Sequence, residues 1–140
     1  MIINIYLQTH GIHMLSVTFD ESRSIITLEP DSSLTIEDFH SARRIIDEHL
    51  SLEGRLKGLI IQTESFPGWA SFEAFLGHLK FIKDHHQWVK HVALVTNSPI
   101  AQLAEPLAKH FINAKIRHFS YDEEEYARRW ILNDNDYGEV

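Results

Sequence analysis

Histidine is the residue type in this sequence that first suggests chemistry, because its ring can bind metals or transfer protons near neutral pH. The chain has ten histidines, and His78, His85 and His86 fall close together in one predicted helix. No HExxH motif or other spacing typical of a zinc site accompanies them. His85 and His86 lie near the C-terminal end of that helix, where the helix dipole stabilises a protonated imidazole. The pattern therefore predicts no metal site and no cofactor.

The residue types that act as nucleophiles, acid–base pairs or phosphate ligands also lack the spacing that their chemistry requires. The chain has no cysteine and no GxSxG, GxGxxG or P-loop motif. Its paired carboxylates form the run from Asp122 to Glu125 at the start of a predicted helix, where solvated acidic residues interact favourably with the helix dipole. The sequence therefore predicts a protein that is not an enzyme.

Composition limits the class of protein further. The 140 residues suffice for one domain, and 20 acidic against 13 basic side chains give a formal charge of −7 without a basic cluster, which argues against nucleic-acid binding. The absence of cysteine suits a reducing cytoplasm. Residues 1–13 lack the basic start of a signal peptide, and no later stretch approaches the length of a membrane span. We expect a cytoplasmic protein, with peripheral membrane association left open.

The central part of the chain joins the most apolar strand candidate to the longest helix candidate. Leu59 to Ile61 form a short apolar run that predicts a buried parallel strand, and a turn at Pro67 and Gly68 leads into a helix over residues 69–86. One face of this helix is an ordinary apolar stripe for packing on a sheet. The opposite face presents Phe81 among small residues, and leaving Phe81 in water forfeits roughly 1.5–3 kcal/mol of burial free energy. We therefore expect a ligand, a neighbouring element or a second subunit to cover it.

The flanking sequence supplies the remaining elements of an α/β fold. Pro106 interrupts the helix expected over residues 99–111. Ser120 with Glu123, or Asp122 with Glu125, forms the expected cap of the last helix, which begins after residue 120. In order along the chain, we expect strands at residues 14–18, 24–28, 59–61, 91–96 and 115–119, and helices at residues 36–49, 69–86, 99–111 and after residue 120. This order predicts a mixed five-stranded sheet with four helices.

A series of short motifs spans most of the chain. They are FPGW at residues 66–69, HLKF at 78–81, DHH at 84–86, VALV at 92–95 and IRHF at 116–119, followed by Ala127 and Trp130. In this order they resemble the SpoIIAA-like proteins, small bacterial relatives of the STAS domain (sulfate transporter and anti-sigma-factor antagonist), which are also similar in architecture to the lipid-binding CRAL-TRIO domains. The resemblance implies one domain over residues 14–132, with residues 1–13 as an N-terminal extension or extra strand and residues 133–140 as a polar tail.

The regulatory serine of the related anti-sigma-factor antagonists has no counterpart in this sequence. In those proteins a serine in an Asp-Ser-Ser-Gly motif is phosphorylated, which switches partner binding. The corresponding region here reads SFPGWAS, with Ser65 and Ser71 as the nearby serines. We therefore expect no phosphoserine switch.

Two functions from different classes fit the sequence. The first is a non-enzymatic binding module that accepts a lipophilic small molecule or a membrane surface beside the central helix. The second is a STAS-type regulatory domain that binds a protein partner, and a homodimer through the same surface is a further alternative. The aromatic residues that could line or cover the ligand site are Phe66, Trp69, Phe72, Phe81, Trp88 and Phe111.

Overall fold

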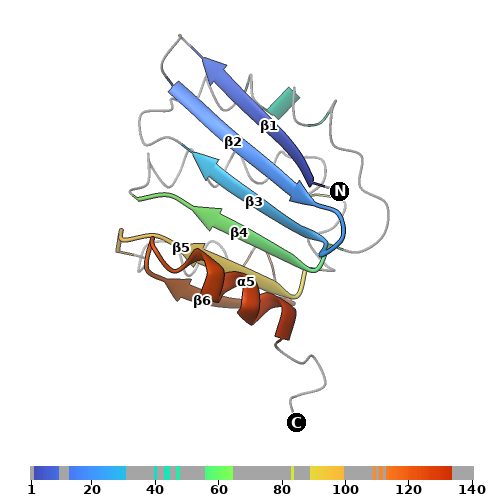
Figure 1. The fold of residues 1–140 in the computed structure, drawn as a ribbon, viewed down its shortest axis with the longest axis vertical. Coiled ribbons are helices and arrows are strands. Elements are labelled where there is room, and N and C mark those ends of the chain that lie inside the picture. Colours follow the sequence, from blue (N-terminus) through green and yellow to red (C-terminus); the bar gives the residue numbers. More distant parts are fainter. Residues whose placement is uncertain are drawn as a thin grey trace.

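A mixed six-stranded sheet with a helix packed against it forms the described part of the fold (Figure 1). The structure, a computed structural model, describes residues 2–9, 13–30, 40, 43–44, 47, 56–64, 83, 89–99, 109, 111 and 113–133. The strands lie across the sheet in sequence order. They are β1 (Ile2–Thr9), β2 (His13–Asp20), β3 (Ile25–Pro30), β4 (Gly58–Gln62), β5 (His91–Val95) and β6 (Lys115–Phe119), and the helix is α5 (Glu124–Asn133).

The first three strands form an antiparallel meander. β1 pairs with β2 along its whole length, from Ile2 opposite Asp20 to Thr9 opposite His13. β2 pairs with β3 in the same antiparallel sense, and this hairpin contains the strands expected at residues 14–18 and 24–28. The sheet has six strands instead of the expected five, because β1 lies within residues 1–13, for which an extension or an extra strand was expected, and it extends the meander by one strand.

The turn between β2 and β3 is held by the carboxylate of Asp20. Asp20 Oδ1 accepts hydrogen bonds from Ser22 Oγ at 2.9 Å and from the Arg23 amide at 3.4 Å. Ser24 ends the turn with a φ of 57°, so β3 begins one residue later than expected. The Ser24 carbonyl also accepts a hydrogen bond from the Lys57 amide at 2.8 Å, which joins the turn to the start of β4.

The second half of the sheet is parallel, from β3 through β4 and β5 to β6. Every position of β4 and β5 is buried, as expected for parallel strands covered on both faces, and the apolar run from Leu59 to Ile61 that predicted a buried parallel strand lies in β4. β6 is different, because Phe119 is its one buried residue. It forms the margin of the sheet (Figure 1).

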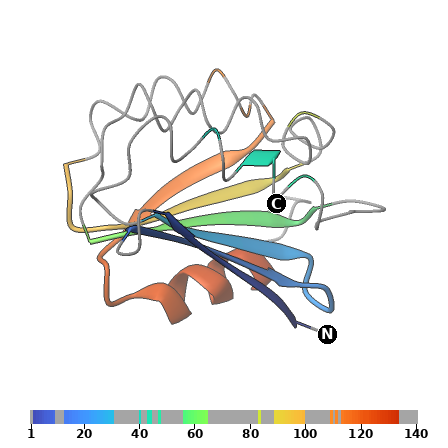
Figure 2. The same cartoon turned by 90° about the horizontal axis from the view of Figure 1, so that it is seen from above.

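Helix α5 covers one face of the sheet (Figure 2). Its buried residues Ala127 and Ile131 lie one turn apart and enter a cluster with Ile25, Ile60, Ala93, Val95 and Phe119. Gly58 allows this close packing, because a Cβ at that position would lie 2.6 Å from Ile131 Cγ2. Trp130 and Leu132 flank the cluster.

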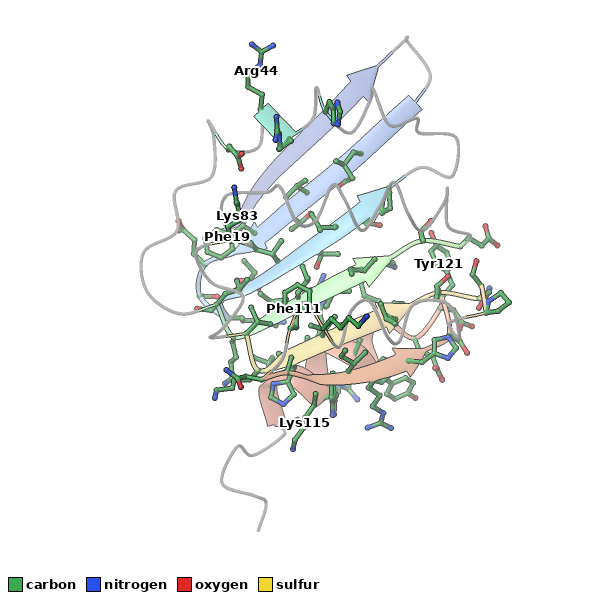
Figure 3. All side chains as sticks on the ribbon, turned by 180° about the vertical axis from the view of Figure 1, so that it is seen from behind. Phe19, Arg44, Lys83, Phe111, Lys115 and Tyr121 are labelled. Carbon is green, nitrogen blue, oxygen red and sulfur yellow. The ribbon has the colours of Figure 1, made fainter. Side chains whose placement is uncertain are left out.

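The opposite face of the sheet is also buried. Side chains alternate along a strand, so Leu59 and Ile61 point away from α5, and both are fully buried. The described residues within 40–47 lie on this side (Figure 2), as do Arg44, Lys83 and Phe111 in the view from behind (Figure 3). The sheet is therefore covered on both faces, as in other α/β folds.

Of the four predicted helices, α5 is the one with bounds among the described residues. Isolated positions within the others are helical, namely His40, Arg43, Arg44, Asp47, Lys83 and Lys109. Pro99 and Phe111, the expected ends of the third helix, are not helical. The remainder of those three helices lies outside the described residues.

Candidate functional site

An open groove of about 610 Å³ lies between the edge strand β6 and the helix α5. Its lining residues are Arg117, His118 and Phe119 from β6, and Glu123, Tyr126, Arg129, Trp130 and Asn133 from α5 and the residue before it. Tyr126, Trp130 and Asn133 are spaced by four and then three residues, so they form one stripe of the helix. The groove is therefore built where this stripe meets the edge of the sheet.

The start of α5 is fixed by a side-chain cap. Ser120 N donates a hydrogen bond to Glu123 Oε1 at 2.8 Å, which is the reach of a capping-box glutamate back to the preceding chain. The first of the two expected caps is therefore confirmed. Tyr121 N donates to Asn97 Oδ1 at 3.0 Å, so the loop before α5 is also tied to the loop after β5. These contacts fix the position of the start of α5, and with it the stripe of Tyr126, Trp130 and Asn133, relative to β6.

The floor of the groove is a stack of a cation and aromatic rings. The Arg117 guanidinium lies 5.1 Å from the centroid of Phe119 and 6.0 Å from that of Trp130. The Phe119 and Trp130 rings are 5.8 Å apart, and His91 packs its ring against Trp130 at 4.9 Å in an edge-on arrangement. Such contacts hold a guanidinium in place while its N–H groups remain able to donate hydrogen bonds. Arg117 is therefore an oriented, exposed cation.

The rim of the groove presents Tyr126 and Arg129. Tyr126 is 60% exposed, and it is the large hydrophobic side chain that stands out from the surface of the described residues. Arg129 is exposed as well. Tyrosine and arginine are enriched at the energetic centres of protein interfaces, since each offers both apolar area and directed hydrogen bonds.

The C-terminal end of β6 is held by contacts to the loop after β5. His118 Nε2 lies 2.8 Å from the Thr96 carbonyl oxygen, so this nitrogen carries the proton and donates. Thr96 N donates to the Phe119 carbonyl at 2.9 Å, and Thr96 Oγ1 accepts from Ser98 N at 3.0 Å. The edge strand is therefore fixed at its end as well as along β5.

Arg128 anchors α5 to β3 on the other side of the helix. Its guanidinium forms an ion pair with Glu124 and donates from Nη2 to Thr27 Oγ1 at 3.1 Å. Burial raises the pKa of the nearby Glu29 carboxyl above its ordinary value, and the charge of Glu124 adds to the rise while Arg128 opposes it. This cluster stabilises the helix position but does not line the groove.

The described lining residues of the groove are suited to binding. Two guanidinium groups and three aromatic rings can recognise carboxylates, extended peptides or ring systems, and none of the described lining residues is a serine, threonine, cysteine or lysine. Within the described part of the chain, no three histidine, cysteine or carboxylate side chains are placed to hold a metal ion. The same part of the chain contains no helix of the length and apolar character needed to cross a membrane.

The aromatic site expected from the sequence falls mostly outside the described residues. Five of its six residues lie in parts of the chain that the structure does not describe, so a shared site for them stays a prediction. They are Phe66, Trp69, Phe72, Phe81 and Trp88. Phe111 is described and is 1% exposed, which makes it one of the largest fully buried side chains.

The groove was not predicted from the sequence. Arg117, Phe119 and Trp130 were noted for their resemblance to family motifs, without a role in a site. One signal was present, because Arg117 and Phe119 share a face of a strand while Tyr126 and Trp130 share a face of the following helix. What was missing was the tertiary contact that brings the two faces together.

Comparison with known proteins supports the architecture. A model of the SpoIIAA-like family matches residues 25–132, from the start of β3 nearly to the end of α5. No match was found among curated proteins, and none among solved structures. The family match covers well over half of the chain. The mixed α/β sheet of the structure agrees with the relationship to STAS domains that the motifs suggested. The chain belongs to the SpoIIAA-like family.

Proposed function

We propose that this protein is a non-enzymatic regulatory domain that binds a partner protein, and that the groove between β6 and α5 is its binding surface. Membership of the SpoIIAA-like family supports the regulatory role, because the related STAS domains include regulators that act through protein contacts. Fold alone does not assign a partner, so the assignment of the surface depends on the groove itself.

The observation that most supports this surface is the combination of Tyr126, Arg117 and Arg129 around one open groove. Tyr126 exposes a large ring that would gain burial free energy in a complex. Arg117 is already oriented by the rings of Phe119 and Trp130, so it loses little side-chain entropy when a partner binds. A preorganised arginine beside an exposed tyrosine is typical of an interface hot spot.

The lipophilic-ligand function expected from the sequence gains no support from the described residues. Phe111, the one residue of that site that the structure describes, is buried in the core. The protein-binding alternative therefore becomes the leading proposal.

In this proposal the domain binds its partner without a phosphoserine switch, because SFPGWAS replaces the Asp-Ser-Ser-Gly motif. Intact-mass analysis of the protein from its own host tests this, since a substantial phosphorylated fraction at Ser65 or Ser71 contradicts it.

A photo-crosslinking amino acid at position 126 in the native host tests the proposed surface directly. We expect specific crosslinks to one or a few proteins, and we expect the substitution Arg129→Glu to remove them. Arg44→Glu is the matched control, because Arg44 is also exposed but lies on the opposite side of the sheet (Figure 3). An absence of crosslinks, or an equal loss with both variants, contradicts the proposal.

A further inference from the structure

We infer that the partner segment is an extended, acidic peptide that adds to the sheet as a seventh strand along the outer edge of β6. This inference rests on the proposed function and specifies the chemistry of the partner at the same groove. It combines the direction of the backbone groups of β6, the charge beside them and the shape of the groove.

The backbone of β6 offers hydrogen-bonding groups on its outer side. Lys115 N donates to the Lys90 carbonyl at 2.8 Å, and the Phe119 carbonyl accepts from Thr96 N at 2.9 Å. Residues 115 and 119 therefore direct their backbone groups toward β5. In a parallel ladder this alternates with every residue, so the N–H and C=O groups of Ile116 and His118 point to the outer edge. No other strand of the described residues pairs with this edge.

The side chains beside this edge are basic, although the chain as a whole has a formal charge of −7. Arg117 points toward the α5 face of β6, where it stacks on Phe119, and Arg129 lies across the groove on α5. Glu123 is the one carboxylate among the described lining residues, and it already accepts a hydrogen bond from the Ser120 amide. An acidic segment is therefore repelled by most of the molecule and attracted to this edge, which favours both specificity and correct orientation.

A second copy of the chain fits this edge poorly. Antiparallel pairing of two β6 strands about Arg117 would place the two Arg117 side chains directly opposite each other, at the position where side chains approach most closely. Like charges in that position destabilise a strand pair. A partner strand with a glutamate or aspartate opposite Arg117 reverses this interaction, and a second acidic residue two positions away lies on the same face toward the groove. These are the features of β-strand addition, in which the main chain supplies affinity and alternate side chains supply specificity.

The direct test uses a capped, fluorescently labelled peptide of alternating glutamate and valine, titrated against the full chain by fluorescence anisotropy. We expect saturable binding that weakens as salt is raised. A peptide of the same length with lysine in place of glutamate should not bind. The variant Arg117→Glu should weaken binding of the glutamate peptide by at least about tenfold, because it replaces attraction by repulsion at the central position.

The variants His118→Pro and His118→Ala separate strand pairing from simple charge attraction. Both remove the imidazole and its contact with Thr96, but only proline removes the outward N–H, and it leaves the bonds to β5 intact because position 118 does not donate to β5. Whatever the loss of the imidazole costs both variants, we expect His118→Pro to bind the peptide at least about fivefold more weakly than His118→Ala. If His118→Pro does not fold, an N-methylated glutamate–valine peptide tests the same hydrogen bonds on the wild type.

Each other outcome overturns the inference in a recognisable way. No saturable binding up to millimolar peptide, or equal affinity for His118→Pro and His118→Ala together with tolerance of N-methylation, removes strand addition. Sedimentation that shows a wild-type dimer and a monomeric His118→Pro assigns the edge to a second copy. If crosslinks from position 126 persist in His118→Pro cells, the proposed function stands and only the strand-addition mode is refuted. If the crosslinks are absent from the wild type, the proposed function itself fails.

Discussion

Replacing Gly58 with alanine tests how closely α5 is packed on the sheet. A Cβ at this position would lie 2.6, 2.9 and 3.2 Å from the Cγ2, Cδ1 and Cγ1 atoms of Ile131. Carbon atoms pack best about 3.5–4.0 Å apart, so the nearest methyl group must move by about 1 Å. Ile131 cannot turn away, because a β-branched side chain in a helix has essentially one χ1 rotamer and this one is fully buried. The helix itself must therefore shift.

The expected loss follows from two opposing effects. Overpacking a buried site typically costs about 1–3 kcal/mol. Replacing a glycine by alanine, where the backbone conformation is compatible with a side chain, regains about 0.4–1 kcal/mol because the unfolded chain loses freedom. We therefore expect Gly58→Ala to lower the free energy of unfolding by about 1–2 kcal/mol, with a melting temperature lower by about 3–8 °C. Urea denaturation followed by circular dichroism measures both the midpoint and the slope of the transition.

A double-mutant cycle with Ile131→Ala identifies the cause. Ile131→Ala alone should cost about 2–5 kcal/mol through the cavity it leaves. In the double variant the new methyl group at position 58 enters that cavity, so the combined loss should be smaller than the sum of the single losses by at least about 1 kcal/mol. Additivity within about 0.5 kcal/mol would show that the two positions do not compete for space, which refutes the packing argument.

Three further predictions concern charged residues. Burial raises the pKa of Glu29, so its stabilising contribution is present below the ordinary value and lost as pH rises through the folded value. Glu29→Gln should therefore stabilise the protein near neutral pH and have little effect in acid, as measured by denaturation at several pH values. Burial alone would raise the pKa of Asp20, but its hydrogen bonds and the charge of Arg23 lower this pKa overall. Asp20→Asn should therefore destabilise the protein at neutral pH. The difference in stability between the variant and the wild type should vanish as pH falls through the lowered pKa. Arg128→Met should lower the free energy of unfolding by about 1–2 kcal/mol, as measured by urea denaturation. Arg129→Met is the control because Arg129 is exposed, and a loss for Arg128→Met no larger than the loss for Arg129→Met would contradict an anchoring role.

Local pattern in the sequence was sufficient for most of the described sheet. The apolar run at Leu59 predicted a strand buried on both faces, because only a parallel strand between two layers needs apolar side chains on each side. Alternation predicted β6 with its bounds unchanged, from Lys115 to Phe119. The Ser120–Glu123 cap predicted the start of α5, since its geometry depends on residues three positions apart. Each of these features depends on residues that lie close together in the sequence.

The features that the sequence did not predict depend on contacts between distant residues. Ser24 adopts a left-handed conformation that its residue type does not demand, so the hairpin boundary was placed one position early. The groove joins Arg117 to Trp130 and Trp130 to His91, and these distances are set by how α5 crosses the sheet. Periodicity assigns each residue to a face, but it does not state which faces meet.

The contact between Arg128 and Thr27 also has a consequence for the order in which the molecule is made. It joins residues 101 positions apart in the chain, so a ribosome completes all six strands before it begins α5. A nascent sheet at that stage leaves Ile25, Ile60 and Ala93 uncovered on the α5 side, because the helix that buries them has not yet been synthesised. Exposed apolar strands of this kind are prone to aggregation during folding. We therefore expect the new chain to need protection of this apolar face until residues 120–133 have left the ribosome and α5 has packed against the sheet.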